Sequence, residues 1–165
     1  MSPKVESKEE TKQNKLPTNV RELYPLFNNT GFMISRAREL ELANFGLTLE
    51  QGVLLHTLIK MGGSATLSEL SADTVRQYHS VSTLVNRMTK LGLVKKVKHS
   101  DKKKFEVSIT DKGLNIYSNA TCNSLDMIFS VLSIKDRRAF AKCLQLLSAR
   151  ARNVLGLDYK HPFLA

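Results

Sequence analysis

Residues 64–113 have the sequence SATLSELSADTVRQYHSVSTLVNRMTKLGLVKKVKHSDKKKFEVSITDKG, and this stretch decides the fold. Thr66 and Glu69 have the spacing of a capping box, which predicts that a short helix begins here. After a polar turn, apolar residues recur at intervals of three and four, which predicts a second helix with one buried face. These residues are Tyr78, Val81, Leu84, Val85, Met88 and Leu91. Gly92 is placed to end that helix in a left-handed conformation.

The residues after Gly92 predict a β-hairpin with a basic tip. Residues 93–98 form one strand, and residues 105–110 alternate apolar and polar side chains with the period of a half-buried strand. The tip between them is Ser-Asp-Lys-Lys-Lys. Helix, turn, helix and basic hairpin in this order are typical of a winged helix-turn-helix, whose second helix has the shape that enters a DNA major groove. The sequence therefore predicts a mainly α protein with a small β-hairpin wing.

The polar face of the second helix and the lysines of the hairpin are the candidate DNA-binding residues. The helix presents short hydrogen-bonding and cationic side chains, which suit contacts to base edges or phosphates. These are His79, Ser80, Ser82, Thr83, Asn86 and Arg87. Arg87 suits a phosphate contact or a structural ion pair as well as a base contact. The lysines that would neutralise phosphates are Lys102, Lys103 and Lys104 at the tip, with Lys95, Lys96 and Lys98 before it.

The ordered set of motifs resembles the multiple antibiotic resistance regulator (MarR) family. The likeness is carried by Leu84-Val85-x-Arg87-Met88-x-x-x-Gly92-Leu93-Val94, Asp101-x-Lys103 and Ile109-Thr110-Asp111-Lys112-Gly113, and it continues outward through Gly46-Leu47-Thr48 and Ser133-Ile134-Lys135-Asp136. Lys103 stands where the family usually has a wing arginine, so a point charge replaces a planar fork. Residues 72–77 lack the family's usual Leu-Gly-Leu-Ser pattern, and Thr74 and Gln77 are expected to cap the recognition helix instead.

The resemblance implies a winged helix-turn-helix flanked by N- and C-terminal dimerisation helices. The DNA-reading unit would span about residues 49–113 and the dimerisation helices about residues 19–45 and 111–155. The implied function is that of a sequence-specific transcriptional regulator, a repressor acting as a homodimer on an inverted-repeat operator in double-stranded DNA. Family members are commonly released from DNA by a small aromatic or anionic effector, and the sequence identifies no residue that would bind one. A winged-helix module that binds protein or RNA is the alternative.

The outer parts of the chain predict the remaining helices. Capping residues start helices at Asn19, Thr48, Thr110 and Ser133, and the helix from Thr110 is expected to run unbroken through Leu132. The first and last helices carry more apolar surface than a compact winged domain can cover, which favours a homodimer over a monomeric bundle. Residues 1–15 are charged and poor in apolar side chains, so we expect a flexible tail before a single domain at 16–165.

Charge favours a polyanionic partner. The chain has 25 Lys and Arg against 15 Asp and Glu, a net charge of +10. Residues 74–112 hold ten basic and three acidic side chains, so most of the excess lies in the presumed DNA-binding stretch. A surface that is basic for solubility alone would mix its signs more evenly.

The same sequence points away from catalysis, metals and membranes. The four histidines have no carboxylate or cysteine at a catalytic or zinc-binding spacing, so we expect no enzyme, no metal and no cofactor. Cys122 and Cys143 also lack metal-ligand spacing and are expected to be small core residues of a reducing compartment. No apolar run reaches membrane-spanning length and the N-terminus is not a signal peptide, which predicts a cytoplasmic protein.

Overall fold

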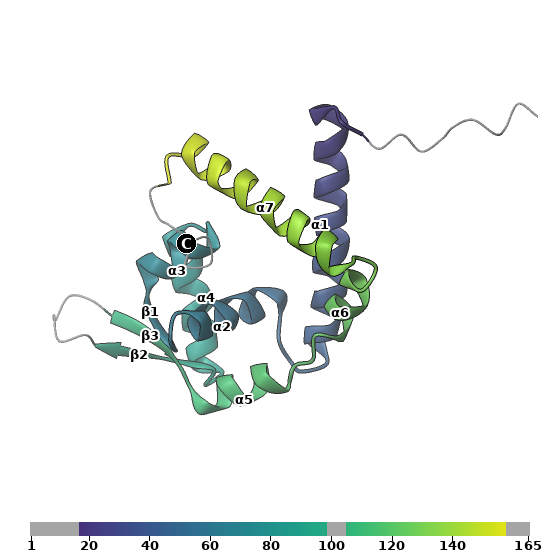
Figure 1. The fold of residues 1–165 in the computed structure, drawn as a ribbon. Helices are drawn as coiled ribbons and strands as arrows, with labels where there is room; N and C mark the ends of the chain where they lie inside the picture. Colours follow the sequence, from purple (N-terminus) through teal and green to yellow (C-terminus); the bar gives the residue numbers. More distant parts are fainter. Residues whose placement is uncertain (1–16, 99–104, 158–165) are drawn as a thin grey trace, which may run out of the picture. The chain divides into compact units, whose positions relative to one another are not determined.

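The computed structural model describes residues 17–98 and 105–157 (Figure 1). In chain order the elements are α1 (Val20–Ala43), α2 (Leu49–Lys60), β1 (Ser64–Thr66), α3 (Leu67–Thr74), α4 (Tyr78–Lys90), β2 (Val94–Lys98), β3 (Phe105–Ile109), α5 (Asp111–Asn119), α6 (Asn123–Phe129) and α7 (Ile134–Val154). The predicted tail at residues 1–15 and the tip lysines Lys102, Lys103 and Lys104 lie outside the described residues.

Contacts divide the described residues into two units, with the boundary between Ile34 and Ser35. The first unit contributes the N-terminal part of α1. The second unit contains the rest of α1 and every later element, including the helix-turn-helix and its sheet. The predicted fold class, mainly α with a small β wing, is confirmed.

The sheet of the second unit is antiparallel, with strand order β1-β3-β2 (Figure 1). The predicted hairpin is formed by β2 and β3, in which Val94 pairs with Ile109 and Lys96 with Val107. The sequence did not predict β1, which pairs Ala65 with Val107. Three residues are too few to show an alternating pattern, and Thr66 at its end also caps α3.

One hydrophobic core holds the helix-turn-helix against this sheet. It takes leucines from α2 and α3, the apolar face of α4 and the inner side chains of β2 and β3. Its largest fully buried members are Leu42, Leu54, Leu55, Leu58, Leu70, Val81, Val85, Met88, Val94 and Val107. Burying this set supplies the main driving force for the fold, and it also fixes which face of α4 points to solvent.

Local capping signals set the helix starts as predicted. Complete capping boxes occur at Thr48 with Gln51 and at Thr66 with Glu69. The Thr110 hydroxyl accepts from the Gly113 amide, and Ser133 caps α7. These pairs satisfy amides that the first turn of a helix would otherwise leave without a partner.

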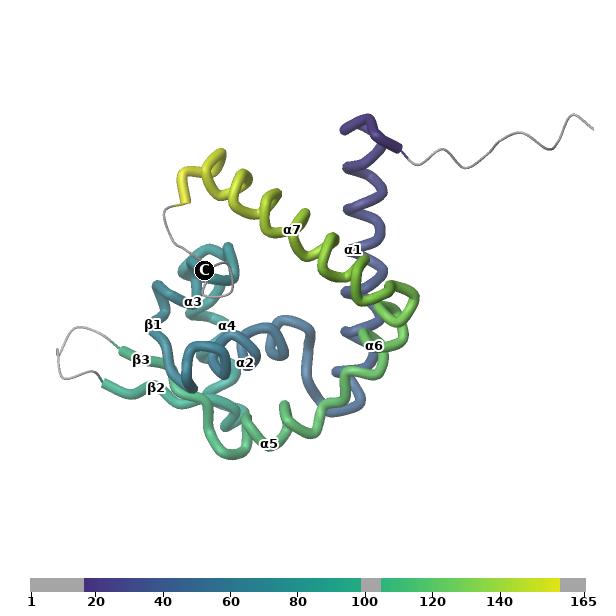
Figure 2. Tube along the Cα trace, in the orientation of Figure 1, coloured from purple at the N-terminus to yellow at the C-terminus, as the bar shows by residue number. Residues whose placement is uncertain are grey.

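The prediction of one helix from Thr110 through Leu132 is wrong. Figure 2 shows the chain leaving α5, turning, and beginning α6 in a new direction. The break follows Ala120, whose backbone is extended with ψ 110°. The Thr121 carbonyl and hydroxyl both bond to side chains of α1, so tertiary contacts hold the break open.

Two predictions of buried residues are also wrong. Tyr78 and Leu91 are exposed, because they stand at the two ends of α4, beyond the part that packs on α2 and α3. Cys122 and Cys143 are exposed as well. Cys122 lies at the break before α6, and Cys143 lies on α7, in which no residue is buried.

The turn between α3 and α4 holds Val75 in a left-handed conformation, with φ 52° and ψ 39°. Among the residues that the structure describes, it is the only non-glycine residue with positive φ. The predicted caps are wrong: the Thr74 hydroxyl donates to the Leu70 carbonyl, and Gln77 occupies the N-cap of α4 without a side-chain bond. A β-branched residue fits this conformation poorly, because its Cβ crowds the backbone.

Val75→Gly is therefore expected to raise the free energy of unfolding by about 0.5–1 kcal/mol, the strain relieved less the entropy that glycine adds to the unfolded chain. Urea denaturation at one protein concentration measures this change. The control is Val53→Gly, at an exposed position within α2, which should lower the same free energy by about 0.5 kcal/mol. A loss of stability in both variants would show that the Val75 side chain makes contacts that outweigh its strain.

Candidate nucleic-acid interface

The helix-turn-helix is fixed at both ends of α4. In the turn before it, the Ser71 hydroxyl donates to the Arg76 carbonyl at 2.6 Å, and Arg76 forms an ion pair with Glu50 of α2 at 2.7 Å. After it, Gly92 adopts φ 72° as predicted, and Lys112 Nζ donates to the Leu91 carbonyl at 2.8 Å. The start and the end of α4 are thus tied to its neighbours.

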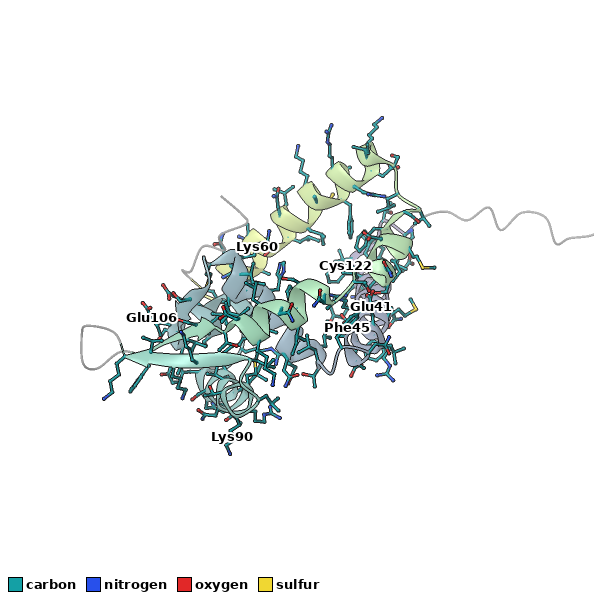
Figure 3. The ribbon with its side chains drawn as sticks, turned by 90° about the horizontal axis from the view of Figure 1, so that it is seen from below. Glu41, Phe45, Lys60, Lys90, Glu106 and Cys122 are labelled. Atoms are coloured by element: carbon teal, nitrogen blue, oxygen red, sulfur yellow. The ribbon has the colours of Figure 1, made fainter. Side chains whose placement is uncertain are left out.

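Burial of one face decides what α4 presents to solvent. Val81, Leu84, Val85 and Met88 are buried, and on the opposite side successive residues at intervals of three and four form the centre of the exposed face. This central row is His79, Thr83, Asn86 and Lys90. Lys90, labelled in Figure 3, projects outward from the end of the helix.

The predicted site residues on α4 fall into a centre and two edges. His79, Thr83 and Asn86 lie in the central row and are exposed. Ser80 and Ser82 are separated by about 200° around the helix axis, so they lie on opposite edges. Ser80 is exposed, whereas Ser82 is half-buried. The two serines therefore do not share one surface.

Polar contacts already organise part of this face. The Thr83 hydroxyl donates to the His79 carbonyl at 2.9 Å. Lys96 Nζ, on β2, donates to Asn86 Oδ1 on α4 at 2.7 Å. The wing strand and the recognition helix are thus joined by side chains at the surface where DNA is expected.

Arg87 is exposed on the edge of α4 that faces α2. It borders an open hollow of about 340 Å³ that is also lined by Thr48, Glu50, Gln51, Leu84, Lys90 and Leu91. This position separates Arg87 from the edge of α4 that Lys96 reaches. Of the three roles considered for Arg87, a phosphate contact, a structural ion pair and a base contact, this position favours the base contact least.

The wing strand β2 carries further exposed cations, of which Lys96 bonds to α4. Lys95, Lys96 and Lys98 of β2 are all exposed. Sequence reasoning placed Tyr78 in the core, but it is 53% exposed at the first turn of α4. It was missed because an aromatic residue at the helical spacing has the pattern of a core residue. Its position makes it a further candidate for contact with DNA.

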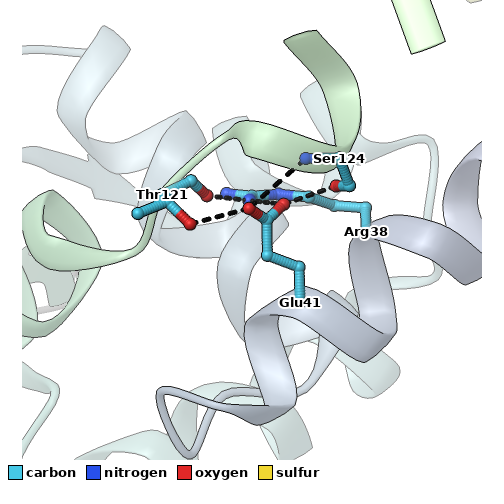
Figure 4. A network of polar contacts seen from close by, with 4 residues as sticks. All are labelled: Arg38, Glu41, Thr121 and Ser124. Carbon is cyan, nitrogen blue, oxygen red and sulfur yellow. Dashed lines mark hydrogen bonds and ion pairs between the residues drawn. The ribbon is translucent and has the colours of Figure 1, made fainter. Parts of the chain in front are cut away.

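Away from α4, a polar network joins the end of α1 to the break between α5 and α6 (Figure 4). Glu41 accepts hydrogen bonds from Arg38 at 2.9 Å, from the Thr121 hydroxyl at 2.7 Å and from the hydroxyl and amide of Ser124. Arg38 also donates to the Thr121 carbonyl. The Arg38 and Glu41 side chains are each only 10% exposed.

These bonds lower the pKa of Glu41 to about 2. The Ser124 hydroxyl is the largest cause, and the Thr121 and Arg38 side chains act in the same direction, while burial opposes them. The carboxylate is therefore charged at every pH at which the protein is expected to work. No sequence pattern marked this network, since its partners are about 80 residues apart in the chain.

A second polar pair lies between α2 and α5. The Tyr117 hydroxyl is 3.0 Å from His56 Nδ1, and their ring centroids are 6.1 Å apart. Burial is the main cause that lowers the pKa of His56, with the charge of Lys60 acting in the same direction, and burial raises the pKa of Tyr117. Both side chains are thus held in their neutral forms near pH 7.

In residues 17–98 and 105–157, no three His, Cys, Asp or Glu side chains gather as metal ligands would. Of the helices that the structure describes, none combines the length and the apolar character needed to span a bilayer.

The sequence of the helix-turn-helix and wing matches a known family. The family model of MarR matches residues 45–104, a segment that contains α2, β1, α3, α4 and β2. No curated protein matches the chain. The matched segment contains all the predicted site residues of α4 and the wing.

Solved structures resemble most of the chain. The organohalide-sensing transcriptional regulator RdhR, with 2,4-dichlorophenol bound, is 26% identical, with 97% of this chain and 95% of that chain covered and a TM-score of 0.71. AbsC, a MarR family transcriptional regulator from Streptomyces coelicolor, is 19% identical over 84% of this chain and 97% of its own, with a TM-score of 0.74. A MarR mutant from E. coli complexed with operator DNA is 17% identical over 76% and 93%, with a TM-score of 0.70. Because AbsC and the MarR mutant are less than 25% identical to this chain, their similarity shows the fold alone.

Proposed function

We propose that the chain is a DNA-binding transcriptional regulator of the MarR type and that it acts as a homodimeric repressor of an inverted-repeat operator. The observation that carries the proposal is the exposed row of α4, His79, Thr83, Asn86 and Lys90, flanked by the lysines of β2. Short polar side chains contact base edges, and the lysines neutralise phosphates. The MarR mutant solved with operator DNA supports this use of the fold.

The homodimer is supported by apolar side chains that one chain leaves exposed. In α1, Phe32 is 72% exposed, and in α7 no residue is buried even though Ile134, Leu147 and Val154 are apolar. Exposed apolar surface of this extent is typical of an interface between subunits. A two-fold dimer would also place two copies of α4 on successive turns of the major groove.

An effector extends the proposal. The regulator solved with 2,4-dichlorophenol suggests a small aromatic or anionic molecule for this chain as well. His56 and Tyr117 are the proposed contacts for such a molecule, since α2 and α5 carry them to one region of the second unit. The neutral Tyr117–His56 pair would offer a hydrogen bond to a phenol.

Selection of binders from a random duplex library tests the proposed function. We expect an inverted repeat with half-sites about one helical turn apart, bound by two chains as measured by sedimentation. Titration of the recovered complex with 2,4-dichlorophenol and with benzoate tests the effector. Binding without a consensus, which only fades as salt rises, would overturn the proposal in favour of a module that binds protein or RNA. An operator that overlaps a promoter would support repression, and one upstream of it would contradict repression.

A further inference from the structure

The contact between Lys96 and Asn86 fixes the orientation of an amide on the presumed DNA-reading face. Lys96 Nζ donates to Asn86 Oδ1 at 2.7 Å. An ammonium group has donors and no acceptor, so the amide oxygen is the atom that must face it. The Asn86 Nδ2 group consequently points away from Lys96, and both residues are exposed.

The register of the sheet delivers Lys96 to this contact. Lys96 pairs with the buried Val107, so its side chain leaves β2 on the face where the core and α4 lie. Lys95 pairs with Ser108 and leaves β2 on the opposite face. Lys95 and Lys96 are therefore adjacent, exposed and equally charged, but only Lys96 is on the face of β2 from which Asn86 can be reached.

Occupation of the amide oxygen changes which base Asn86 can recognise. A free Asn amide pairs with adenine by accepting from N6 and donating to N7. The bond from Lys96 occupies one lone pair of Oδ1 and places a positive charge beside the only acceptor of the amide, which disfavours approach of the adenine N6 donor. The Nδ2 donors stay available, and donors match the two major-groove acceptors of guanine, O6 and N7.

We propose that Lys96 is a positioning residue that fixes Asn86 as a hydrogen-bond donor, so that the base facing Asn86 in each half-site is guanine. This inference rests on the proposed function, in which α4 enters the major groove. The specificity at this base therefore belongs to a pair of residues on two elements, α4 and β2.

Parallel selections from a random duplex library test the proposal with full-length wild type, Lys96→Met, Lys96→Arg, Asn86→Ala and Lys95→Met. Lys96→Met frees Oδ1, so one half-site position should change from guanine toward adenine by about tenfold in relative affinity. Asn86→Ala should lose the preference at that same position. Lys96→Arg, which keeps a donor, should retain guanine.

Lys95→Met is the matched control, because it removes the same charge from the other face of β2. Its consensus should equal that of the wild type, with binding weakened alike on all duplexes. A wild-type consensus that Lys96→Met leaves unchanged would overturn this inference while leaving the proposed function intact. Absence of any consensus with the wild type would overturn both.

Discussion

Thr83→Glu is expected to abolish site-specific DNA binding, with a loss of affinity of at least about 100-fold. Thr83 lies in the central exposed row of α4, between His79 and Asn86. A carboxylate there would stand against the base edges and phosphates of the groove, where like charges repel. The helix should persist, because Glu has a higher helix propensity than Thr. Fluorescence anisotropy with the duplex recovered by selection measures the loss.

Ser118→Glu is the control for the added charge. Ser118 is exposed on α5, outside the helix-turn-helix, so its replacement should change the affinity only slightly. Sedimentation of both variants should give the same assembly as the wild type. Tight binding by Thr83→Glu would mean that α4 meets DNA through another face, and the assignment of the central row would then be wrong.

Glu41→Gln is expected to lower the free energy of unfolding by about 1–3 kcal/mol at pH 7, because hydrogen bonds from Ser124, Thr121 and Arg38 lower the pKa of Glu41 on folding. The amide that replaces the carboxylate has one acceptor oxygen, and its NH₂ group would face a donor from Arg38 or Ser124. A buried donor is then left without its partner, which is costly. Urea denaturation of both proteins at pH 7 measures the difference.

The same variant has a defined pH dependence. Because the folded pKa lies below the unfolded one, the stabilisation from Glu41 is complete above about pH 4.5 and is lost as the pH falls toward 2. The difference between the wild type and Glu41→Gln should therefore narrow over that interval. A difference that stays constant from pH 7 to pH 3 would show that the carboxylate charge is not what stabilises the network.

Glu39→Gln provides the comparison. Glu39 forms an ion pair with Arg36 at 2.6 Å, in the same helix and with the same spacing as Glu41 and Arg38. The side chains of Arg36 and Glu39, however, are each about half exposed. An exposed pair of this kind is worth about 0–1 kcal/mol. Glu39→Gln should thus change stability little at any pH, and the contrast isolates the effect of the buried network.

The features of the fold that were predictable from sequence are those set by neighbours in the chain. Capping pairs such as Thr66 with Glu69 act over three residues, and the apolar spacing of α4 acts over successive turns, so both appear directly in the sequence. The break between α5 and α6 depends instead on Arg38 and Glu41, which lie far away in the chain. The residues around Thr121 are weak helix formers, but that preference alone does not place a break.

The candidate site was predictable to the level of a helix face. Periodicity separated the polar side of α4 from its buried side, and the central residues His79, Thr83 and Asn86 were among those named. It did not separate the centre from the edges, so Ser82 was treated as equal to Thr83 although it is half-buried. The link from Lys96 to Asn86 required the pairing of β2 with β3, which a lysine-rich strand does not reveal.

If Lys96 has the proposed role, the pairing of Val94 with Ile109 and of Lys96 with Val107 gives the hydrophobic core an influence on the DNA sequence that is recognised. If β2 shifted by one residue, Lys96 would turn away from α4, and Asn86 Oδ1 would lose its ammonium partner. Burial of Val94 and Val107 opposes that shift, so under the proposal these valines would influence a base that they do not contact. Insertion or deletion of one residue in the wing would then change the preferred base at one operator position, although the sequence of α4 stayed the same. Relatives with identical recognition helices need not share an operator.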